Sequence, residues 1–338
     1  MVGFAFDDRS ERAQLILVGA VAIAFIVLGL AVVFNTVLYT ENVASTGAAS
    51  APRDAQILNQ EVELGSKRLV ERVNHQTKPK LPSQANANLT ANLSAYSDNM
   101  TKVIGASSPA LVSFGLTSVA DVTHGARIRD DDGSDFKFGG GAKNWTAMYS
   151  SGAGAIVRDF DMDVDRSSLE GASQYAFHVA WLGPSNNHVV WIYETAGGQV
   201  AIRTVNNTAK PGPDFSGTEC VLPGSDSAST VTFNFSDGNI EGYDACDGQL
   251  GPWATIDNGT TRNVKFFRGD NATGRYSLAV NDQSELNPSL NLPTDSLFDS
   301  GDPYWTWDVW EFEVEVRYES GQVSYTEEYY VEVYNRSR

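Results

Sequence analysis

The stretch WEFEVEVRYESGQVSYTEEYYVEVY, residues 310–334, decides the fold of this chain. In its first half every second side chain is apolar, and a strand sends alternate side chains to opposite faces. One face consists of Trp310, Phe312, Val314, Val316 and Tyr318, and the other of Glu311, Glu313, Glu315 and Arg317. Residues 319–322 have the composition of a tight turn, and β-forming residues follow them. The stretch predicts a long antiparallel hairpin with an apolar inner face and an acidic outer face.

Short runs of β-forming residues precede this hairpin from about residue 111 onward. Turn signals such as Gly-Pro, Asn-Asn and Gly-Gly separate them. The runs cover residues 155–164, 175–183, 188–194, 199–205, 229–235, 263–269 and 275–280. In the first run Phe160, Met162 and Val164 alternate with aspartates, which predicts a strand with one exposed face. About ten strands at this spacing are typical of an antiparallel β-sandwich.

Two amphipathic helices are predicted upstream of the strands. Apolar residues recur at helical spacing up to about residue 75 and again after residue 84, with Pro79 and Pro82 between the two segments. The first stripe contains Leu58, Val62, Gly65, Leu69 and Val73, and the second contains Leu89, Leu93, Tyr96, Met100 and Val103. We expect these helices to pack on each other or on the sheet, which gives an α+β fold class.

The N-terminal part contains an uninterrupted apolar stretch, AQLILVGAVAIAFIVLGLAVVF, residues 13–34. Its 22 residues carry no charge, and as a helix they would extend for roughly 33 Å. That length matches the hydrocarbon core of a bilayer, so we expect a transmembrane helix over residues 13–38. Arg9 and Arg12 precede the stretch and the next basic residue is Arg53, which places the N-terminus in the cytoplasm and the C-terminal domain outside.

Three interpretations of this segment remain open at the level of the sequence. A cleaved secretory signal has a shorter apolar core, of about 7–15 residues. A signal anchor agrees with the observed length and is preferred. A pilin-type leader would be cut at the junction of Arg12 and Ala13, although Val18 stands where many pilins carry Glu.

The composition indicates a folded protein adapted to high salt. The chain has 42 acidic and 24 basic residues and a formal net charge of −18. A charge of this sign disfavours binding to nucleic acid or to an anionic lipid surface. Because the chain is 42% hydrophobic and 11% aromatic, its acidity does not indicate disorder.

Two further features favour an exported domain. Every Asn-x-Ser/Thr sequon follows the apolar stretch, so we expect a glycoprotein. The sequons are at Asn88, Asn92, Asn99, Asn144, Asn206, Asn234, Asn258, Asn271 and Asn335. The only two cysteines, Cys220 and Cys246, are expected to form a disulfide in an oxidising compartment. Closing that loop would contribute about 3.5 kcal/mol.

An acidic turn is the candidate metal site. The segment RDDDGSD places four carboxylates around a glycine, and oxygen ligands in such a loop can bind Ca²⁺. These residues are Asp130, Asp131, Asp132 and Asp135. An ordinary solvated turn has the same composition and is the favoured interpretation.

Other site chemistry has little support in the sequence. Trp305 and Trp307 of the segment DPYWTWD would suit a sugar-binding platform, but core packing is the default for tryptophan in strands. The chain contains neither a GxSxG nor an HExxH motif. We therefore expect no catalytic residues, no enzymatic activity and no cofactor other than Ca²⁺.

Three stretches carry a resemblance to a known group of proteins. They are ERAQLILVGAVAIAF…VVFNTVLYTENVAS, ARIRDDDGSDFKFGGGAKNWT and VRDFDMDVDRSSL. Together they resemble haloarchaeal membrane-anchored, pilin-like surface proteins of unknown function, in which a short Arg-containing tail precedes a hydrophobic helix and a secreted region. The resemblance covers about the N-terminal half of the chain. It implies a surface protein associated with pilus-like or secretion machinery, and it supplies no catalytic residues.

These expectations divide the chain into a cytoplasmic tail (1–12), a transmembrane helix (13–38), a linker and helical region (39–108) and a β-rich extracellular domain (109–338). The expected function is that of a membrane-anchored, glycosylated cell-surface protein of the archaeal envelope, pilin-like or adhesive. The alternatives are an extracellular carbohydrate- or Ca²⁺-binding module and, third, a secreted hydrolase. The expected partners are the lipid membrane and other pilin-like or envelope subunits, and not nucleic acid.

Overall fold

The computed structural model of the protein describes residues 27, 30, 56–107, 110–139, 141–149, 157–173, 175–183, 187–207, 218–223, 229–250, 263–290, 303–321 and 323–334. The predicted transmembrane segment, residues 13–38, lies outside the described residues except for Val27 and Leu30. Among the helices of the described part, none has the length and apolar character needed to cross a membrane.

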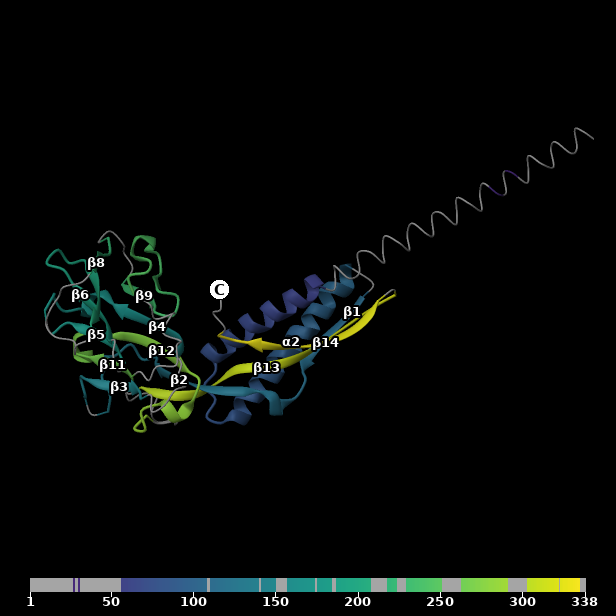
Figure 1. Ribbon diagram of the computed structural model, residues 1–338, viewed down its shortest axis with the longest axis horizontal. Coiled ribbons are helices and arrows are strands. Elements are labelled where there is room, and N and C mark those ends of the chain that lie inside the picture. The colour runs from purple at the N-terminus through teal and green to yellow at the C-terminus, as the bar shows by residue number, and fades with distance from the viewer. Residues whose placement is uncertain are drawn as a thin grey trace, which may run out of the picture.

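Two antiparallel sheets form most of the fold (Figure 1). The larger sheet has the order β1 (Ala110–Leu116), β13 (Tyr304–Ser320), β2 (Thr123–Asp130), β12 (Gly274–Val280), β4 (Val157–Asp165), β9 (Thr230–Asn234) and β10 (Asn239–Ile240), and β14 (Ser324–Glu332) also pairs with β13. The smaller sheet has the order β3 (Trp145–Met148), β11 (Asn263–Phe267), β5 (Phe177–Leu182), β6 (Asn187–Glu194), β7 (Val200–Asn207) and β8 (Thr218–Val221). The predicted antiparallel, sandwich-like α+β architecture is confirmed.

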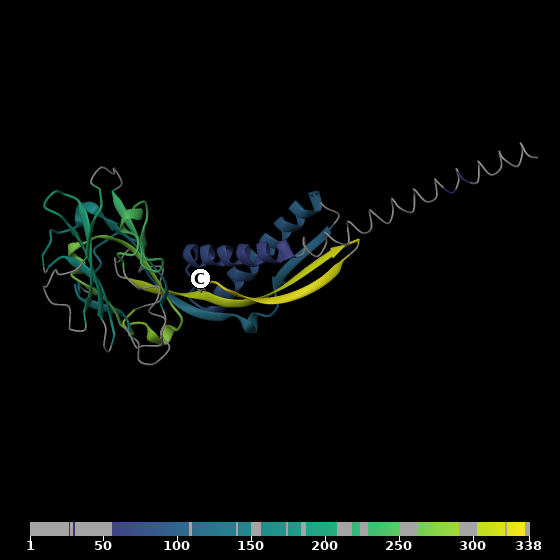
Figure 2. The ribbon, with the colours of Figure 1, turned by 45° about the horizontal axis from the view of Figure 1, so that its top comes forward.

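The molecule has two parts with separate hydrophobic cores (Figures 1 and 2). The head is the sandwich formed by the smaller sheet and by β2, β12, β4, β9, β10 and the first half of β13. The stalk consists of a helix over residues 56–76, the helix α2 (Pro82–Ser107), β1, β14 and the second half of β13. In Figure 2 both helices lie on the same side of the β13–β14 hairpin.

Strand β13 is 17 residues long and belongs to both parts. Its first half pairs with β2, and its second half lies between β1 and β14. The register on β2 shifts between Val309 and Glu311, which places Trp310 at a bulge. Gly125 on β2 provides the space for it, because a Cβ there would collide with the Trp310 indole and the Val280 carbonyl. The bulge therefore marks the passage of β13 from the head to the stalk.

Aromatic rings fill the core of the head. Trp145 and Phe266 stack with their centroids 5.0 Å apart, and Phe136 stacks on Phe177 at 4.9 Å. Phe160, Met162 and Val164 of β4 are buried in this core, and Val157 at its start packs against it half-buried. The apolar face predicted for this strand is confirmed, but the opposite face is not exposed: Asp159 is buried and Asp161, Asp163 and Asp165 are half-buried, because side chains of neighbouring segments cover them.

The stalk core lies between the two helices and the sheet. The helices contribute Leu58, Val62, Val70, Ala85, Leu89 and Leu93, and β13 contributes Phe312, Val314, Val316 and Tyr318. The predicted inner face of the hairpin is therefore confirmed. On α2 the stripe continues from Met100 to Ile104 rather than to Val103, which is 66% exposed, because four residues keep a side chain on the same face.

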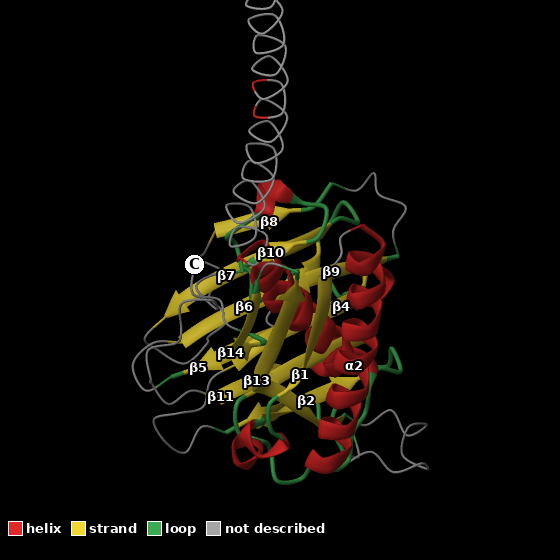
Figure 3. Cartoon of the chain, turned by 90° about the vertical axis from the view of Figure 1, so that its right-hand side faces the viewer, coloured by secondary structure: helices red, strands yellow, loops and turns green. Residues whose placement is uncertain are grey.

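Helix α2 covers the outer edge of β1 (Figure 3). The Ser97 hydroxyl accepts a hydrogen bond from the Phe114 backbone N–H at 2.9 Å, and the Thr101 hydroxyl donates to the Val112 carbonyl. Unpaired backbone groups on an edge strand are a template for association with other chains. These two side chains satisfy part of that edge within the molecule.

The first helix runs from the hairpin tip to the head. Near its start, the Asn59 side chain accepts a hydrogen bond from the Tyr325 hydroxyl at 3.1 Å, close to the turn between β13 and β14. Near its end, Asn74 donates to the Val309 carbonyl at 2.7 Å and to the Tyr334 hydroxyl at 2.9 Å, where the stalk meets the head. The start of the first helix therefore lies at the end of the stalk that is remote from the head.

Two helical glycines give a matched test of this packing. A Cβ on Gly65 would lie 2.6 Å from Cζ of Tyr96, whose ring contacts Phe114, whereas a Cβ on Gly105 would meet no atom within 4 Å. We expect Gly65→Ala to lower the free energy of unfolding by about 1–3 kcal/mol through overpacking. We expect Gly105→Ala to raise it by about 0.5–1 kcal/mol through helix propensity. Chemical denaturation in detergent would measure the free energy of unfolding of the two variants. Equal values would contradict the packing described for the helices.

Candidate functional site

A buried group of charged side chains, which we name the joint, connects the head to the stalk. Its centre is Arg127 on β2, whose side chain is 0% exposed. Its Nε donates to Asp308 at 2.7 Å, its Nη1 to Asp159 at 2.8 Å and to Ser277 at 2.6 Å, and its Nη2 to the Tyr334 hydroxyl at 2.6 Å. One guanidinium thus binds side chains from β13, β4, β12 and the C-terminal residues.

The alternation of β2 explains why two arginines face the stalk. Ala126 and Ile128 belong to the head core, so Arg127 and Arg129 point to the opposite face of the sheet. Asp308 lies on the same outer face of the neighbouring strand β13, where the register pairs it with Gly125. The strand pairing therefore brings the cation and its first carboxylate together.

Arg127 and Asp159 are both charged in the folded protein. Burial disfavours the charge on Arg127, but the carboxylates of Asp308 and Asp159 outweigh that effect and hold its pKa well above the ordinary value. Burial likewise acts to raise the pKa of Asp159, but Arg127 and His75 lower it further than burial raises it. Burial also raises the pKa of Tyr334 well above its ordinary value, so this phenol stays neutral. The ion pairs compensate for charges that would be costly to bury singly.

Arg129 caps the C-terminal end of the first helix. Its Nη1 donates to the His75 carbonyl at 2.5 Å and its Nη2 to the Thr77 carbonyl at 3.1 Å, and Nη2 also contacts the Asn74 carbonyl. The last carbonyls of a helix lack partners within it and attract positive charge. The Asn74 side chain accepts from the Val309 N–H at 3.1 Å and donates to the carbonyl of the same residue. These contacts fix the end of the helix on β2 and β13.

His75 is thereby placed against the aspartates of β4. Its Nε2 lies 3.1 Å from Oδ2 of Asp159, and its side chain is half-buried. One ligand atom each from His75, Asp159 and Asp161 lies within 4.8 Å of the other two. A nitrogen and two carboxylates from separate segments therefore converge at the rim of the joint.

The predicted metal residues do not converge in the same way. In the part of the chain that the structure describes, His75, Asp159 and Asp161 are the one group of three or more potential metal-ligating side chains. The carboxylates of RDDDGSD have other contacts: Asp131 pairs with Lys78 at 2.7 Å, Asp135 pairs with Lys137 at 2.5 Å, and Asp132 accepts from the Ser134 N–H at 2.8 Å. Their geometry is that of a turn stabilised by local pairs.

Asp130 differs from its neighbours because it faces the head core and is 2% exposed. Burial, together with a hydrogen bond to Asp132 and the charge of that carboxylate, raises the pKa of Asp130 to about 8. Oδ2 of Asp130 and the hydroxyl of Tyr276 are buried and have no hydrogen-bond partner among the described residues. The raised pKa favours the protonated form of Asp130 near neutral pH, beside the carboxylate of Asp132.

The tryptophan pair lies in the interior rather than on a flat surface. Trp305 is 8% exposed and belongs to the head core, and Trp307 is half-buried between the two cores. Their rings meet edge to face with centroids 5.3 Å apart. This burial disfavours the sugar-binding platform that the sequence raised.

The cysteines and several sequons lie in the described part. Cys220 of β8 forms a disulfide with Cys246, with their Cα atoms 5.8 Å apart. Asn99 and Asn144 are exposed, whereas Asn88, Asn92, Asn234 and Asn271 are half-buried. The amide of Asn234 donates to Asp237 at 3.0 Å, and that of Asn271 donates to the Tyr175 carbonyl. The Asn206 side chain, Asn258 and Asn335 lie outside the described residues. Glycosylation stays a prediction, and Asn99 and Asn144 are its most accessible positions.

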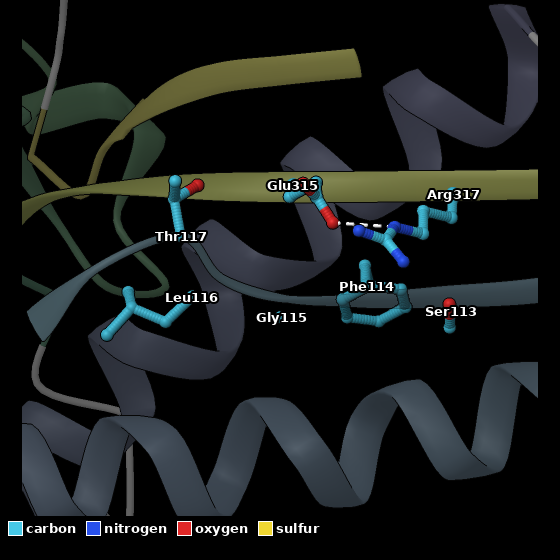
Figure 4. Close-up of a pocket in the computed structure, with 7 residues that line it drawn as sticks. All are labelled: Ser113, Phe114, Gly115, Leu116, Thr117, Glu315 and Arg317. Atoms are coloured by element: carbon cyan, nitrogen blue, oxygen red, sulfur yellow. Dashed lines mark ion pairs between the residues drawn. The ribbon is translucent and has the colours of Figure 1, made fainter. Parts of the chain in front are cut away.

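A surface hollow of about 350 Å³ lies beside β1 (Figure 4). Residues 113–117 of the β1 segment line it together with Glu315 and Arg317 of β13. These two side chains form an ion pair at 2.7 Å, so their charges neutralise each other inside the hollow. The arrangement provides space next to Gly115 but no net charge with which to select a ligand.

Sequence reasoning missed the joint. Its principal residues are His75, Arg127, Arg129, Asp159, Asp308 and Tyr334. The pattern ARIRD did contain a signal, because arginines that alternate with alanine and isoleucine lie on one face of a buried strand. The partners of these arginines could not be assigned before the strand order was known.

The model of a family described as a family of unknown function (DUF7261) matches residues 9–139. This stretch is less than half of the chain, and it includes the predicted membrane segment, both stalk helices, β1 and β2. No curated protein and no solved structure matches the chain.

The buried and exposed arginines allow a direct test of the joint. We expect Arg127→Met to lower the free energy of unfolding by about 3–5 kcal/mol, because it leaves the buried carboxylates of Asp159 and Asp308 uncompensated. Arg317→Met removes an ion pair from a side chain that is 65% exposed, and we expect a change below about 1 kcal/mol. Equal losses in urea denaturation would contradict the role assigned to the joint.

The protonated state of Asp130 predicts a pH dependence. The unfolded chain loses this proton near the ordinary pKa of 3.8, whereas the folded chain keeps it to about pH 8. Stability from this group is therefore present at low pH and falls as pH rises between those values, by about 1.4 kcal/mol for each unit of difference. We expect Asp130→Asn to stabilise the protein at pH 8 and to have little effect at pH 4. Thermal melts at the two pH values would measure the effect, with Asp131→Asn as the control. Partial burial acts to raise the pKa of Asp131, but Lys78 and Tyr304 lower it further. We therefore expect Asp131→Asn to gain no stability at pH 8.

Proposed function

We propose that the protein is a membrane-anchored, glycosylated surface protein of the archaeal envelope that displays the head away from the membrane. In this proposal the segment 13–38 spans the bilayer with the N-terminus in the cytoplasm. The protein acts through pilin-like assembly or adhesion rather than through catalysis.

The direction of the stalk is the observation that carries the proposal. The first helix begins beside the hairpin tip and ends at the joint, as its contacts with Tyr325 and Val309 indicate. Its 21 described residues extend for about 31 Å. A chain that leaves a membrane and enters at the tip would therefore hold the head at the far end of the stalk.

The chemistry of the head agrees with exposure outside the cell. The Cys220–Cys246 disulfide is stable in an oxidising compartment, whereas disulfides are uncommon in the cytosol.

The stalk surface agrees with exposure to concentrated salt. The outer face of the stalk hairpin carries Glu311, Glu313, Glu315, Glu319, Glu328 and Glu332. Within it Glu311 lies opposite Glu332 and Glu315 opposite Glu328, an arrangement that like-charge repulsion disfavours at low salt. Such a face is suited to concentrated salt, where repulsion is screened.

A pilin-like or adhesive role follows from the same arrangement and from the resemblance of the N-terminal half to haloarchaeal pilin-like proteins. A helix that packs along a sheet, as the helix over residues 56–76 does, presents a rigid rod to neighbouring subunits. A head at the end of that rod is positioned for contact with other cells or with envelope components. The family match over residues 9–139 coincides with the membrane segment and the stalk helices and names no activity.

Surface proteolysis of intact cells would test the topology. We expect the chain in the membrane fraction, with its head cleaved from the outside and Asn99 or Asn144 carrying sugar. Deletion of residues 13–34 should release the protein from the membrane, whereas deletion of the linker residues 41–52 should not. A chain that is soluble in the cytoplasm, or a head protected from external protease, would overturn the proposal.

N-terminal sequencing of protein from native membranes would separate the two forms of the proposal. A start at Ala13 or Gln14 indicates leader cleavage and pilin-like assembly. An intact N-terminus indicates a permanent anchor and an adhesive head.

A further inference from the structure

We propose that His75, Asp159 and Asp161 bind one divalent transition-metal ion, of the class of Zn²⁺, which fastens the stalk helix to strand β4 of the head. The proposal goes beyond the function proposed above and does not depend on where the protein resides. It rests on the distances between the donor atoms, on how they are held and on the type of each donor.

The distances suit a single ion. Zinc lies about 2.0–2.1 Å from imidazole nitrogen and about 2.0–2.2 Å from carboxylate oxygen. Two adjacent ligand atoms at that range are therefore about 3.0–3.5 Å apart for octahedral or tetrahedral geometry. The observed separation between Nε2 of His75 and Oδ2 of Asp159 is 3.1 Å, a distance at which the two atoms also form a hydrogen bond without an ion, and one oxygen of Asp161 lies within 4.8 Å of each.

Both sides of the site are held in place. Asp159 and Asp161 are two residues apart on β4, so their side chains share one face of a paired strand. His75 follows Asn74, whose side chain makes two hydrogen bonds to the backbone of Val309. The carbonyl of His75 itself accepts from Arg129. The backbone positions of the donors are therefore fixed by contacts independent of any ion.

Arg127 orients one of the proposed ligands without being a ligand itself. Carboxylates that bind metal ions are commonly oriented by further hydrogen bonds. Asp159 accepts from Nη1 of Arg127 at 2.8 Å, and Arg127 is balanced on its other side by Asp308 at 2.7 Å. Arg127 therefore holds the Asp159 carboxylate with Oδ2, the oxygen that it contacts, also facing His75.

The donor set selects the class of ion. One imidazole nitrogen and two carboxylate oxygens suit Zn²⁺ and related first-row ions, whereas Ca²⁺ takes six to eight oxygen ligands. Three protein donors leave further positions for water, and the half-buried His75 gives access from solvent. The site therefore differs in both place and chemistry from the Ca²⁺ turn considered at residues 130–135.

Calorimetric titration of Zn²⁺ into the chelator-treated full chain in detergent would test the proposal, with Ca²⁺ titrated in parallel. We expect one Zn²⁺ per chain and no Ca²⁺ at this site. His75→Gln and Asp161→Asn should each weaken Zn²⁺ binding by at least about tenfold. His124→Gln and Asp163→Asn are matched controls, because His124 pairs with Asn86 and Asp163 with Thr232 away from the three donors, and both should bind as the wild type does.

Three results would overturn the proposal: no saturable Zn²⁺ binding by the wild type, wild-type affinity in either site variant, or an equal loss in the controls. Cu²⁺ in place of Zn²⁺ provides a measurement on the wild type alone. Its electron paramagnetic resonance spectrum should show coupling to a single imidazole nitrogen, and a spectrum without nitrogen coupling would contradict the role of His75.

Discussion

The relation between head and stalk depends on the buried Arg127, which forms ion pairs with Asp159 and Asp308 of the head and donates a hydrogen bond to Tyr334 beside the stalk core. The three charged side chains come from β2, β4 and β13 and are almost completely buried. Because a buried charge without a partner is costly, any other placement of these strands and of the C-terminal Tyr334 would be penalised strongly. Arg129 extends the same constraint to the first helix by binding the carbonyls at its end. The joint thus fixes one orientation of the two parts.

Hydrophobic packing stabilises each part, and β13 contributes side chains to both cores. The strand contributes Trp305 to the head core and Phe312, Val314 and Val316 to the stalk core. The bulge at Trp310 lies between these residues, and Gly125 accommodates its indole. Backbone continuity keeps the cores adjacent, and the polar joint determines how they are oriented. The two contributions are separate, because the first depends on apolar area and the second on paired charges.

The fold was predictable where its signal is local. Alternation in residues 310–318 and 155–164 predicted the buried faces of β13 and β4, because side chains in a strand repeat with period two. Helical spacing predicted Leu89 and Leu93 in the stalk core for the same kind of reason, and it failed at Val103, near the end of α2, where Ile104 takes the core-facing position instead. Nothing in the pattern of β13 showed that its partner changes from β2 to β1 and β14.

The joint was not predictable, because its contacts join residues remote in sequence. Arg127 is 181 positions from Asp308 and 207 from Tyr334, and His75 is 84 from Asp159. The acidic turn at 130–135 attracted attention because its carboxylates are adjacent in sequence, whereas the converging donors come from a helix and a strand. Proximity of carboxylates along the chain was therefore a poor guide to proximity in the fold.

Strand β13 also determines how the molecule would carry tension. It runs along the long axis from the head toward the hairpin tip (Figure 1). Interstrand hydrogen bonds in an antiparallel pair are perpendicular to the strands, so a pull along this axis loads the bonds between β13 and β2 in shear. Bonds loaded in shear share the force and break together, whereas bonds at the end of a peeled strand break one after another. A force applied along this axis to the head would thus reach the hairpin tip through the mechanically strong direction of the sheet.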